Sequence, residues 1–385
     1  MKGTPESSLC TFLGVSRTRN HPTGYISKIL VSPIQVNDNV PPHPRQVRHH
    51  LGAEVSPEHP LLFDYASLTG IEFEFDAKTT VSVHLDTPKA FQTFLTREHE
   101  AWQTKRDADL QELHRYSMTA SDKVLQKLDA GIPVAYIAGQ KEFCGTSFAV
   151  SPAVMIPKIG TEVLVKAAVS RVMSSRTSSA RSHVLDLGTG SGCLLLSILK
   201  QCPRAIGLGI DISPGALQIA QSNSRVLASP SNAHFMEASF TTLANHLLST
   251  YAAHLLAAQH TKTRGCVIPF DCIVTNPPYL ARGLWDSNRI YAQQRHEPRM
   301  AVVGGEEGTE AYVQIREGLA QCMEGGWVQA GRTVLFVEVN NSELAGAVRR
   351  IFEAEGSTEE PRWRYVRCEV DGKGMDRCVV FEYKQ

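Results

Sequence analysis

Val184-Leu-Asp-Leu-Gly-Thr-Gly-Ser-Gly192 is the stretch of sequence that decides the fold. The apolar run at 183–187 predicts a short buried strand, three glycines follow it at alternate positions, and a helix is expected from Ser191. Glycine has no Cβ, so a loop of this kind lets a ligand approach the backbone closely. A strand, a glycine loop and a helix in this order predict an open α/β sheet, which binds ligands at the carboxyl ends of its strands.

Strands and helices alternate through the rest of the chain. Further strands are expected at 205–211, 234–237, 270–275, 333–339, 365–370 and 377–383, and helices at 161–173, from 213, at 240–260, at 307–323 and at 342–355. This alternation predicts a mostly parallel seven-stranded sheet covered by helices on both faces. The last two strands are joined by a glycine-bearing turn at 371–374, which predicts an antiparallel pair at one edge.

The region before the sheet differs in composition. Residues 1–52 are rich in Ser, Thr, Asn and Pro, and the first 50 hold six Lys and Arg against two acids, a balance of +4. This segment is either a disordered tail or an organelle transit segment. Residues 53–135 are expected to form a small, mainly helical substrate-docking domain with short strands at 71–75 and 81–85. A hairpin linker is expected at 136–159, and the catalytic domain at 160–385.

Composition excludes several classes of protein. The 385 residues contain 39 Lys and Arg and 39 Asp and Glu, and this zero net charge argues against binding nucleic acid or membranes by bulk charge. No window approaches 18 uncharged apolar residues, so no transmembrane helix is expected. The nine cysteines are scattered without a CxxC pair, which argues against a disulfide scaffold and predicts no metal site.

An acidic residue follows the glycine loop at a distance typical of nucleotide sites. Asp211 ends the second predicted strand, 21 residues after Gly190, where its carboxylate can accept both hydroxyls of a ribose. A dinucleotide fingerprint would need glycine where the chain has Cys193. The spacing therefore favours S-adenosylmethionine, with Asp186 holding its amino-acid moiety directly or through water, over a glycine-rich turn without ligand. The candidate cofactor-binding residues are Asp186, Gly188, Thr189, Gly190, Ser191, Gly192, Asp211, Ile212, Ser239 and Asn276.

A second motif, Asn276-Pro-Pro-Tyr279, ends the fourth predicted strand. Proline lacks a backbone N–H, so this strand end presents two acceptors, the Asn276 side-chain oxygen and the Pro277 carbonyl. These acceptors can take both N–H bonds of a planar –NH2 group and turn its lone pair toward a methyl donor, while Tyr279 packs on its flat face. The motif predicts methyl transfer to a planar nitrogen, although alone it also fits a polyproline turn. The candidate catalytic and substrate-binding residues are Asn276, Pro277, Pro278 and Tyr279.

Four blocks of sequence together resemble the HemK-type glutamine N5-methyltransferases, which modify the glutamine of the Gly-Gly-Gln motif in peptide chain release factors. Two blocks are the motifs above, and the others are Ile132-Pro-Val-Ala-Tyr-Ile-Ala-Gly-Gln-Lys-Glu-Phe143 and Glu297-Pro-Arg-Met-Ala-Val-Val-Gly-Gly-Glu-Glu-Gly308. The resemblance covers residues 125–385. It implies a class I, Rossmann-like S-adenosylmethionine methyltransferase domain, in which the glycine loop and Asp211 bind the cofactor and the second motif holds the glutamine amide. It further implies that Glu297 lies near the site in a packing or substrate-binding role.

The chain departs from that family's pattern at three places. Lys158 and Ile159 stand where the family has Arg-Pro, which keeps the charge of the arginine. The stretch Glu237-Ala-Ser-Phe240 stands where the family has an Asp-Trp or similar pair near the adenine. Ser239 is therefore expected to line the adenine pocket with less stacking area than that pair provides. The connection between Phe240 and Asp271 is longer than in the family and is expected to form a surface helical insertion.

The sequence therefore predicts an S-adenosylmethionine-dependent methyltransferase acting on a protein glutamine. We expect a release factor as partner, no stable nucleic-acid binding, no membrane association and a monomeric chain. The alternative enzyme is an amino-group methyltransferase of nucleic acid, acting on adenine N6 or guanine N2, and the −4 balance of residues 51–385 argues against it. A silent binding module is the third hypothesis. The location is expected to be mitochondrial if the first segment is a transit segment, and otherwise cytoplasmic.

Overall fold

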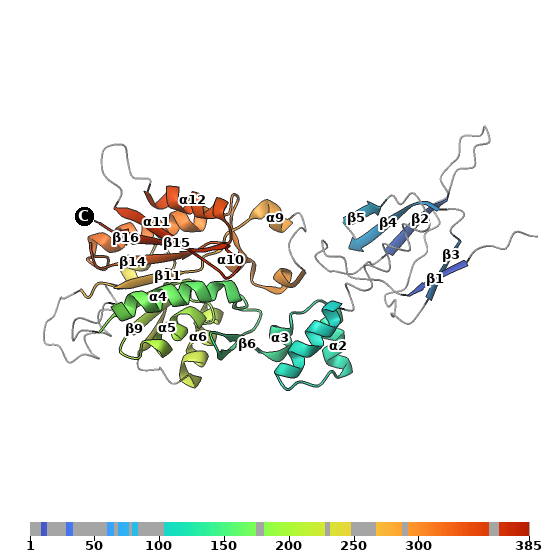
Figure 1. Cartoon of the computed structure of the whole chain (residues 1–385), viewed down its shortest axis with the longest axis horizontal. Helices are drawn as coiled ribbons and strands as arrows, with labels where there is room; N and C mark the ends of the chain where they lie inside the picture. The colour runs from blue at the N-terminus through green and yellow to red at the C-terminus, as the bar shows by residue number, and fades with distance from the viewer. Residues whose placement is uncertain are drawn as a thin grey trace, which may run out of the picture. The chain divides into compact units, whose positions relative to one another are not determined.

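The computed structural model describes most of the chain from residue 104 onward and five strands before it (Figure 1). The described residues are 9–13, 28–33, 60–64, 68–76, 79–83 and 104–384, without 175–180, 228–231, 248–266, 287–291 and 354–361. Most of the predicted amino-terminal tail, part of the domain expected at 53–135 and most of the helix expected at 240–260 lie outside the described residues. The chain divides into two compact units, 1–137 with 287–296 and 138–286 with 297–385.

The first unit contains two small antiparallel sheets and three helices. Its strands are β1 (Leu9–Leu13), β2 (Lys28–Pro33), β3 (Pro60–Asp64), β4 (Leu68–Asp76) and β5 (Thr79–Val83), with β1 paired to β3 and β4 between β2 and β5. Its helices are one at 104–115, α2 (Asp122–Asp129) and α3 (Val134–Ala138). The side chains of Leu113, Leu128 and Val134 form a small apolar core.

Two strands of this unit have no counterpart in the sequence-based expectation. The strands expected at 71–75 and 81–85 are present as parts of β4 and β5. By contrast, β1 and β2 lie within residues 1–52, where no strand was expected. Both pair with residues far along the chain, Ile29 with Phe73 for example, and such distant pairing leaves little trace in a short local pattern.

A seven-stranded sheet organises the second unit. Its strands are β8 (His183–Leu187), β9 (Ile206–Asp211), β10 (Ala233–Glu237), β11 (Cys272–Thr275), β14 (Val334–Glu338), β15 (Trp363–Val370) and β16 (Asp376–Tyr383). They lie in the order β10-β9-β8-β11-β14-β16-β15, and all neighbours are parallel except that β16 is antiparallel to β14 and β15. The predicted mostly parallel sheet with an antiparallel edge pair is confirmed.

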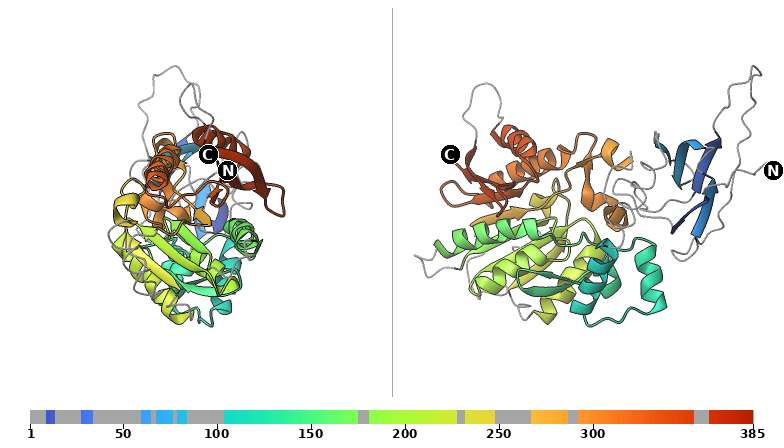
Figure 2. Two further views of the ribbon diagram at one scale, coloured as in Figure 1. Left: turned by 90° about the vertical axis from the view of Figure 1, so that its left-hand side faces the viewer. Right: turned by 45° about the vertical axis from the view of Figure 1, so that its right-hand side comes forward.

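Helices cover both faces of this sheet (Figures 1 and 2). The main ones are α4 (Glu162–Ser174), α5 (Cys193–Gln201), α6 (Pro214–Val226), α11 (Glu310–Glu324) and α12 (Ser342–Glu353). Val184 and Val274 belong to the apolar cluster that contains α4 and α5, whereas Leu185 and Ile273 belong to the cluster that contains α11 and α12. Successive strand residues therefore enter opposite cores, as expected for a parallel sheet buried on both sides.

A hairpin precedes α4 and is tied to the glycine loop. It consists of β6 (Gln140–Phe143) and β7 (Thr146–Ala149). Asn223 on α6 accepts a hydrogen bond from the Ala149 N–H at 2.8 Å, and its Nδ2 donates to the carbonyl oxygens of Ala149 at 3.1 Å and Ser191 at 2.8 Å. Because the Asn223 side chain is buried, these three bonds hold the hairpin and the loop together.

Asp271 anchors the opposite end of the central strands. Its carboxylate accepts a hydrogen bond from the His183 N–H at 2.8 Å and two from the Arg332 guanidinium at 2.8 and 3.0 Å. The residue is 4% exposed. These bonds connect the beginnings of β8, β11 and β14, far along the strands from the glycine loop.

Short elements complete the second unit. They are η2 (Ile159–Thr161), α7 (Leu243–His246), β12 (Leu280–Ala281), α9 (Arg282–Asp286), α10 (Arg299–Val302) and β13 (Val303–Gly305). The short η4 (Ala292–His296) belongs to the first unit. Strands β12 and β13 pair parallel, Leu280 with Val303 and Ala281 with Gly305. Among the residues described, no helix is both long and apolar enough to cross a membrane.

Candidate active site

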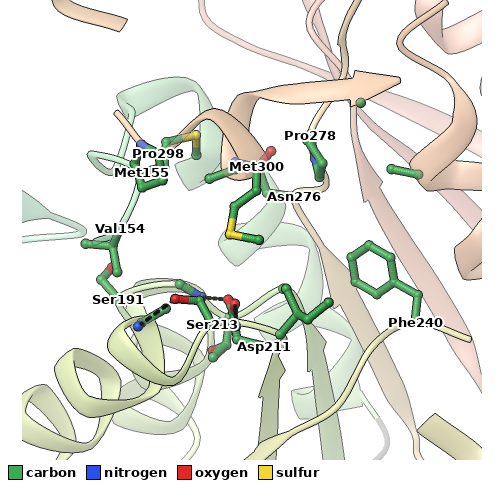
Figure 3. A pocket seen from close by; sticks show the side chains of 18 of the residues that line it. Val154, Met155, Ser191, Asp211, Ser213, Phe240, Asn276, Pro278, Pro298 and Met300 are labelled. Atoms are coloured by element: carbon green, nitrogen blue, oxygen red, sulfur yellow. Dashed lines mark hydrogen bonds between the residues drawn. The ribbon is translucent and has the colours of Figure 1, made fainter. Parts of the chain in front are cut away.

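A cavity of about 370 Å³ lies at the carboxyl ends of β8, β9 and β11 (Figure 3). Its wall contains most of the glycine loop, the end of β9, Asn276 and Pro278, together with parts of segments 153–161, 238–240, 298–305 and 310–314. Open α/β sheets bind ligands at this edge. The two motifs singled out in the sequence thus meet at one cavity.

The glycine loop is pinned to the neighbouring strand. The N–H groups of Gly188 and Thr189 both donate to the Ile210 carbonyl, at 2.9 and 2.8 Å. Gly188 and Gly190 have positive φ angles of 76° and 55°, and no atom lies within 4 Å of the position that a Cβ of Gly190 would occupy. That space belongs to the cavity, so the loop offers bare backbone to a ligand.

The third glycine serves packing rather than binding. Gly192 does not line the cavity. A Cβ there would lie 3.2 Å from both the Ala220 Cβ and a methyl group of Leu196, and the φ angle is +78°. We therefore conclude that Gly192 lets α5 and α6 approach each other beneath the loop.

Asp211 links the loop to the start of α6. Its carboxylate accepts the Gly190 N–H and the Ser213 N–H, both at 2.9 Å. Figure 3 shows Asp211 and Ser213 next to each other at the cavity. Burial raises its pKa above the ordinary range, and the two backbone N–H groups partly offset that effect. Asp211 lines the cavity and Ile212, which is 56% exposed, lines it beside the carboxylate.

Asp186 lies beneath the loop, outside the cavity wall. It is fully buried, and one carboxylate oxygen accepts the Thr189 hydroxyl at 2.7 Å. The other oxygen, Oδ1, has no hydrogen-bond partner in the part of the chain that the structure describes. Burial, opposed by the Thr189 hydroxyl, raises the pKa of Asp186 to about 7. An unsatisfied buried carboxylate oxygen of this kind favours a cationic or hydrogen-bonding ligand group nearby.

Asn276 is the polar residue at the other end of the cavity. Its Nδ2 donates to the Thr161 hydroxyl at 3.5 Å, and that hydroxyl donates to the buried Glu338 carboxylate at 3.0 Å. Its Oδ1 is buried without a hydrogen-bond partner among the described residues. Its role in holding a planar –NH2 group stays a prediction.

The strand end that carries Asn276 packs tightly against β13 and the loop that follows. A Cβ on Gly304 would lie closer than 3.0 Å to three backbone atoms, two of them in the Pro278 carbonyl group. A Cβ on Gly308 would lie 2.5 Å from the carbonyl oxygen of Tyr279. These two glycines explain part of the Glu297–Gly308 block, because any side chain at either position would displace the strand end.

Five of the predicted site residues do not line the cavity, namely Asp186, Gly192, Pro277, Tyr279 and Glu297. Ser239 does line it. The Tyr279 ring packs against the core cluster of α11 and α12, and burial raises the pKa of its hydroxyl. Glu297 is 6% exposed and forms an ion pair with Lys158, with 3.7 Å between Nζ and Oε2.

Several lining residues were not predicted. Val154, Met155, Phe240 and Met300 all contribute apolar surface (Figure 3). The Phe240 ring lies 3.6 Å from the position of a Cβ on Gly188, so aromatic surface is present although the aligned Trp of the family pattern is not. Met300 is 57% exposed. Phe240 could have been predicted, because it directly follows Ser239, which was expected to line the pocket. Nothing in the sequence pattern distinguished the other residues from core residues.

Comparison with known proteins places the chain among methyltransferases. A family model described as a methyltransferase domain matches residues 178–280. The release factor glutamine methyltransferase of Moorella thermoacetica is 32% identical over 264 residues, which cover 68% of this chain and 80% of that protein. The protein of the same name from Koribacter versatilis is 34% identical over 261 residues, covering 67% and 78%. Among solved structures, the hMettl16 catalytic domain in complex with the MAT2A 3'UTR hairpin 6 matches with a TM-score of 0.44 and 11% identity, covering 66% of this chain and 81% of that chain. A structural likeness of that degree carries no argument about the acceptor.

Proposed function

The chain belongs to the release factor glutamine methyltransferase family and is an S-adenosylmethionine-dependent methyltransferase, and from this premise we propose that it methylates the side-chain amide nitrogen of a protein glutamine. The substrate of the proposal is the glutamine of the Gly-Gly-Gln motif in a peptide chain release factor. One observation carries the proposal: Asn276 lines the cavity with a buried Oδ1 that has no partner within the described part of the chain. A primary amide supplies the N–H group that this oxygen lacks.

The residues around the glycine loop fit S-adenosylmethionine. Asp211 has acceptor capacity left for ribose hydroxyls after binding Gly190 and Ser213. The free Oδ1 of Asp186 suits the positive amino-acid end, and the open space above Gly190 gives room for close approach. The apolar side chains of Phe240, Met155 and Met300 supply flat or flexible surface for the remainder. When bound, this cofactor supplies a methyl group activated by a sulfonium.

The chain's part in the reaction is to hold the amide. In the proposal the Asn276 oxygen accepts one N–H bond. The other is accepted by the carbonyl of Pro277, whose two chain neighbours Asn276 and Pro278 line the cavity. The nitrogen lone pair is then turned toward the methyl donor. The Pro278 carbonyl is already packed against Gly304, so it is not assigned to the substrate. Both acceptors gain strength as the N–H protons become more acidic during attack, which favours the transition state over the ground state.

Positioning can supply much of the catalysis. An amide nitrogen is a weak nucleophile because its lone pair is delocalised. Oriented intramolecular reactions gain about 7–11 kcal/mol over their bimolecular counterparts. The proposal therefore requires no side chain to deprotonate the amide beforehand, and the extra proton leaves after attack, to water.

Asn276→Ala tests this assignment. We expect methyl transfer to a release factor to be lost, because the Pro277 carbonyl alone cannot fix the orientation of the amide, while S-adenosylmethionine binding measured by calorimetry stays within about threefold of wild type. Asn245→Ala, at an exposed position outside the cavity, is the matched control and should retain full activity. Near-full activity of Asn276→Ala would refute the role of Asn276, and an inactive wild type that still binds the cofactor would refute the choice of substrate.

A further inference from the structure

We propose that Thr161 and Glu338 are positioning residues that set the orientation of the Asn276 amide. The inference rests on the proposed function, because it concerns how Asn276 comes to present an acceptor to the glutamine amide. Neither Thr161 nor Glu338 is expected to touch the reacting atoms. Their effect on the reaction passes through Asn276.

Strand register brings Glu338 beside Asn276. Strands β11 and β14 are parallel neighbours, and Thr275 pairs with Val337. Glu338 and Asn276 are therefore the next residues on the two strands, at the same edge of the sheet. Thr161 comes from a third segment, at the end of η2 and directly before α4. Three elements that are distant in sequence thus bring Thr161, Asn276 and Glu338 together. Thr161 is 2% exposed and Glu338 is 5% exposed, so the contact between them is buried.

The hydroxyl of Thr161 decides which way the amide faces. A hydroxyl has a single proton, and Thr161 donates it to Oε1 of Glu338 at 3.0 Å. The hydroxyl can then offer Asn276 only a lone pair, which the NH2 group can satisfy and the amide oxygen cannot. Asn276 accordingly donates from Nδ2, at 3.5 Å, and its Oδ1 is left without a partner in the described structure. The carboxylate is thus the group that makes Asn276 an acceptor toward the substrate.

Packing alone does not account for Glu338. Burying a carboxylate costs free energy, and apolar residues of similar volume usually stabilise a core as well or better. Its Oε2 finds no hydrogen-bond partner among the residues that the structure describes, so the desolvation of the carboxylate is only partly offset. Burial raises the pKa of the Glu338 carboxyl to about 7, and the Thr161 hydroxyl, Lys158 and Arg377 partly offset that effect. A role in orienting Asn276 explains a carboxylate at a position where the core would accept leucine.

Three variants separate orientation from folding. Thr161→Val removes the hydroxyl, Thr161→Ser keeps it, and Glu338→Leu removes the carboxylate and leaves the hydroxyl free to donate to Asn276. The measurements are kcat and KM with a release factor, S-adenosylmethionine affinity by calorimetry, and thermal unfolding. We expect kcat to fall about 10- to 100-fold in Thr161→Val and Glu338→Leu, because the amide can turn over and present a donor. We expect KM and cofactor affinity to stay within about threefold, and Thr161→Ser to retain wild-type kcat within about threefold.

The temperature of thermal unfolding distinguishes a positioning role from a structural one. If Glu338 served mainly to stabilise the fold, Glu338→Leu would unfold at a lower temperature than wild type. Under the proposal, Glu338→Leu unfolds at the same or a higher temperature than wild type and yet loses kcat. If Thr161→Val is insoluble because it leaves the buried Glu338 carboxylate without its hydrogen bond, the double variant Thr161→Val/Glu338→Leu replaces it, and we expect the same fall in kcat. The inference is overturned if Thr161→Val or Glu338→Leu keeps the wild-type kcat. It is also overturned if Thr161→Ser loses as much kcat as Thr161→Val, or if KM and cofactor affinity change as much as kcat does. An inactive wild type would instead refute the proposed function.

Discussion

Replacing Gly304 by alanine should slow methyl transfer without removing the cofactor site. A Cβ at residue 304 would lie 2.8 Å from the Pro278 carbonyl carbon and 2.9 Å from the Gly308 carbonyl oxygen, whereas ordinary contacts begin near 3.4 Å. These neighbours are backbone atoms, so no flexible side chain can rotate away. The φ angle of Gly304 is not positive, and alanine therefore meets a steric obstacle without the additional strain of a left-handed backbone.

The size of the effect follows from the displacement. The Pro278 carbonyl carbon has to move from 2.8 to at least 3.4 Å, and its oxygen, which is closer, has to move farther. Asn276 stands two residues earlier on the same rigid, proline-containing segment, so its acceptor moves as well. A misplacement of about 1 Å costs about 100-fold in rate, or about 2.7 kcal/mol of transition-state stabilisation. We expect a loss of that order in kcat.

Single-turnover transfer from labelled S-adenosylmethionine to a release factor measures this loss, with calorimetry as the measure of cofactor affinity. Gly372→Ala is the matched control, because no atom lies within 4 Å of its Cβ position and its φ angle is not positive. The control should keep wild-type rates. A Gly304→Ala rate within about threefold of wild type would refute the claim that the position of this segment limits catalysis.

Three further predictions concern the cofactor site and stability. Burial raises the pKa of Asp186 to about 7, and only the ionised carboxylate attracts a cation, so S-adenosylmethionine affinity should fall as pH decreases from 8 to 6, up to about tenfold per unit below 7. Asp211→Ala should weaken cofactor binding about 10- to 100-fold in calorimetry, because hydrogen bonds to a charged group are lost. Asp271→Asn should lower the free energy of unfolding by about 3 kcal/mol in denaturant titrations, because it breaks the buried pair with Arg332, and should leave kcat unchanged.

Each of these has a control and a contradicting outcome. Asp186→Asn should abolish the pH dependence of binding, and a flat wild-type affinity between pH 8 and 6 would contradict the role of Asp186. Unchanged binding in Asp211→Ala would remove Asp211 from the cofactor site. Arg332→Leu provides the matched test of the Asp271 pair. The account of that pair fails if Asp271→Asn is as stable as wild type, or if it loses activity while folded.

The sequence predicted the elements that carry strong local patterns. Strand β8 is predicted to the residue, and the helix at Pro214 begins with Ser213 as its cap, with the Ser213 hydroxyl accepting the Ala216 N–H. The glycine loop and the Asn276 motif could be found because glycine and proline restrict the backbone in recognisable ways. Their meeting at one cavity followed from the strand order, which alternation of strands and helices made predictable.

Other parts of the site depend on contacts that no local pattern contains. Glu338 lies 177 residues from Thr161, and as the last residue of an apolar strand it gave no indication of its contact with a distant hydroxyl. Gly192 resembled its two neighbours in sequence, yet it serves helix packing because Ala220 lies beside it. Tyr279 was expected over the substrate, and its half-buried ring packs against the core cluster of α11 and α12 and does not line the cavity, because a turn motif specifies the backbone and leaves side-chain direction to the surrounding structure.

The most direct test of the central claim is methyl transfer to a release factor and to its variant in which the glutamine of the Gly-Gly-Gln motif is alanine. The purified full chain is incubated with labelled S-adenosylmethionine and each protein, and the modified residue is located by peptide mass spectrometry. We expect label on the wild-type release factor alone, carried by the side-chain amide of that glutamine. Equal labelling of both proteins, or of neither, would contradict the account.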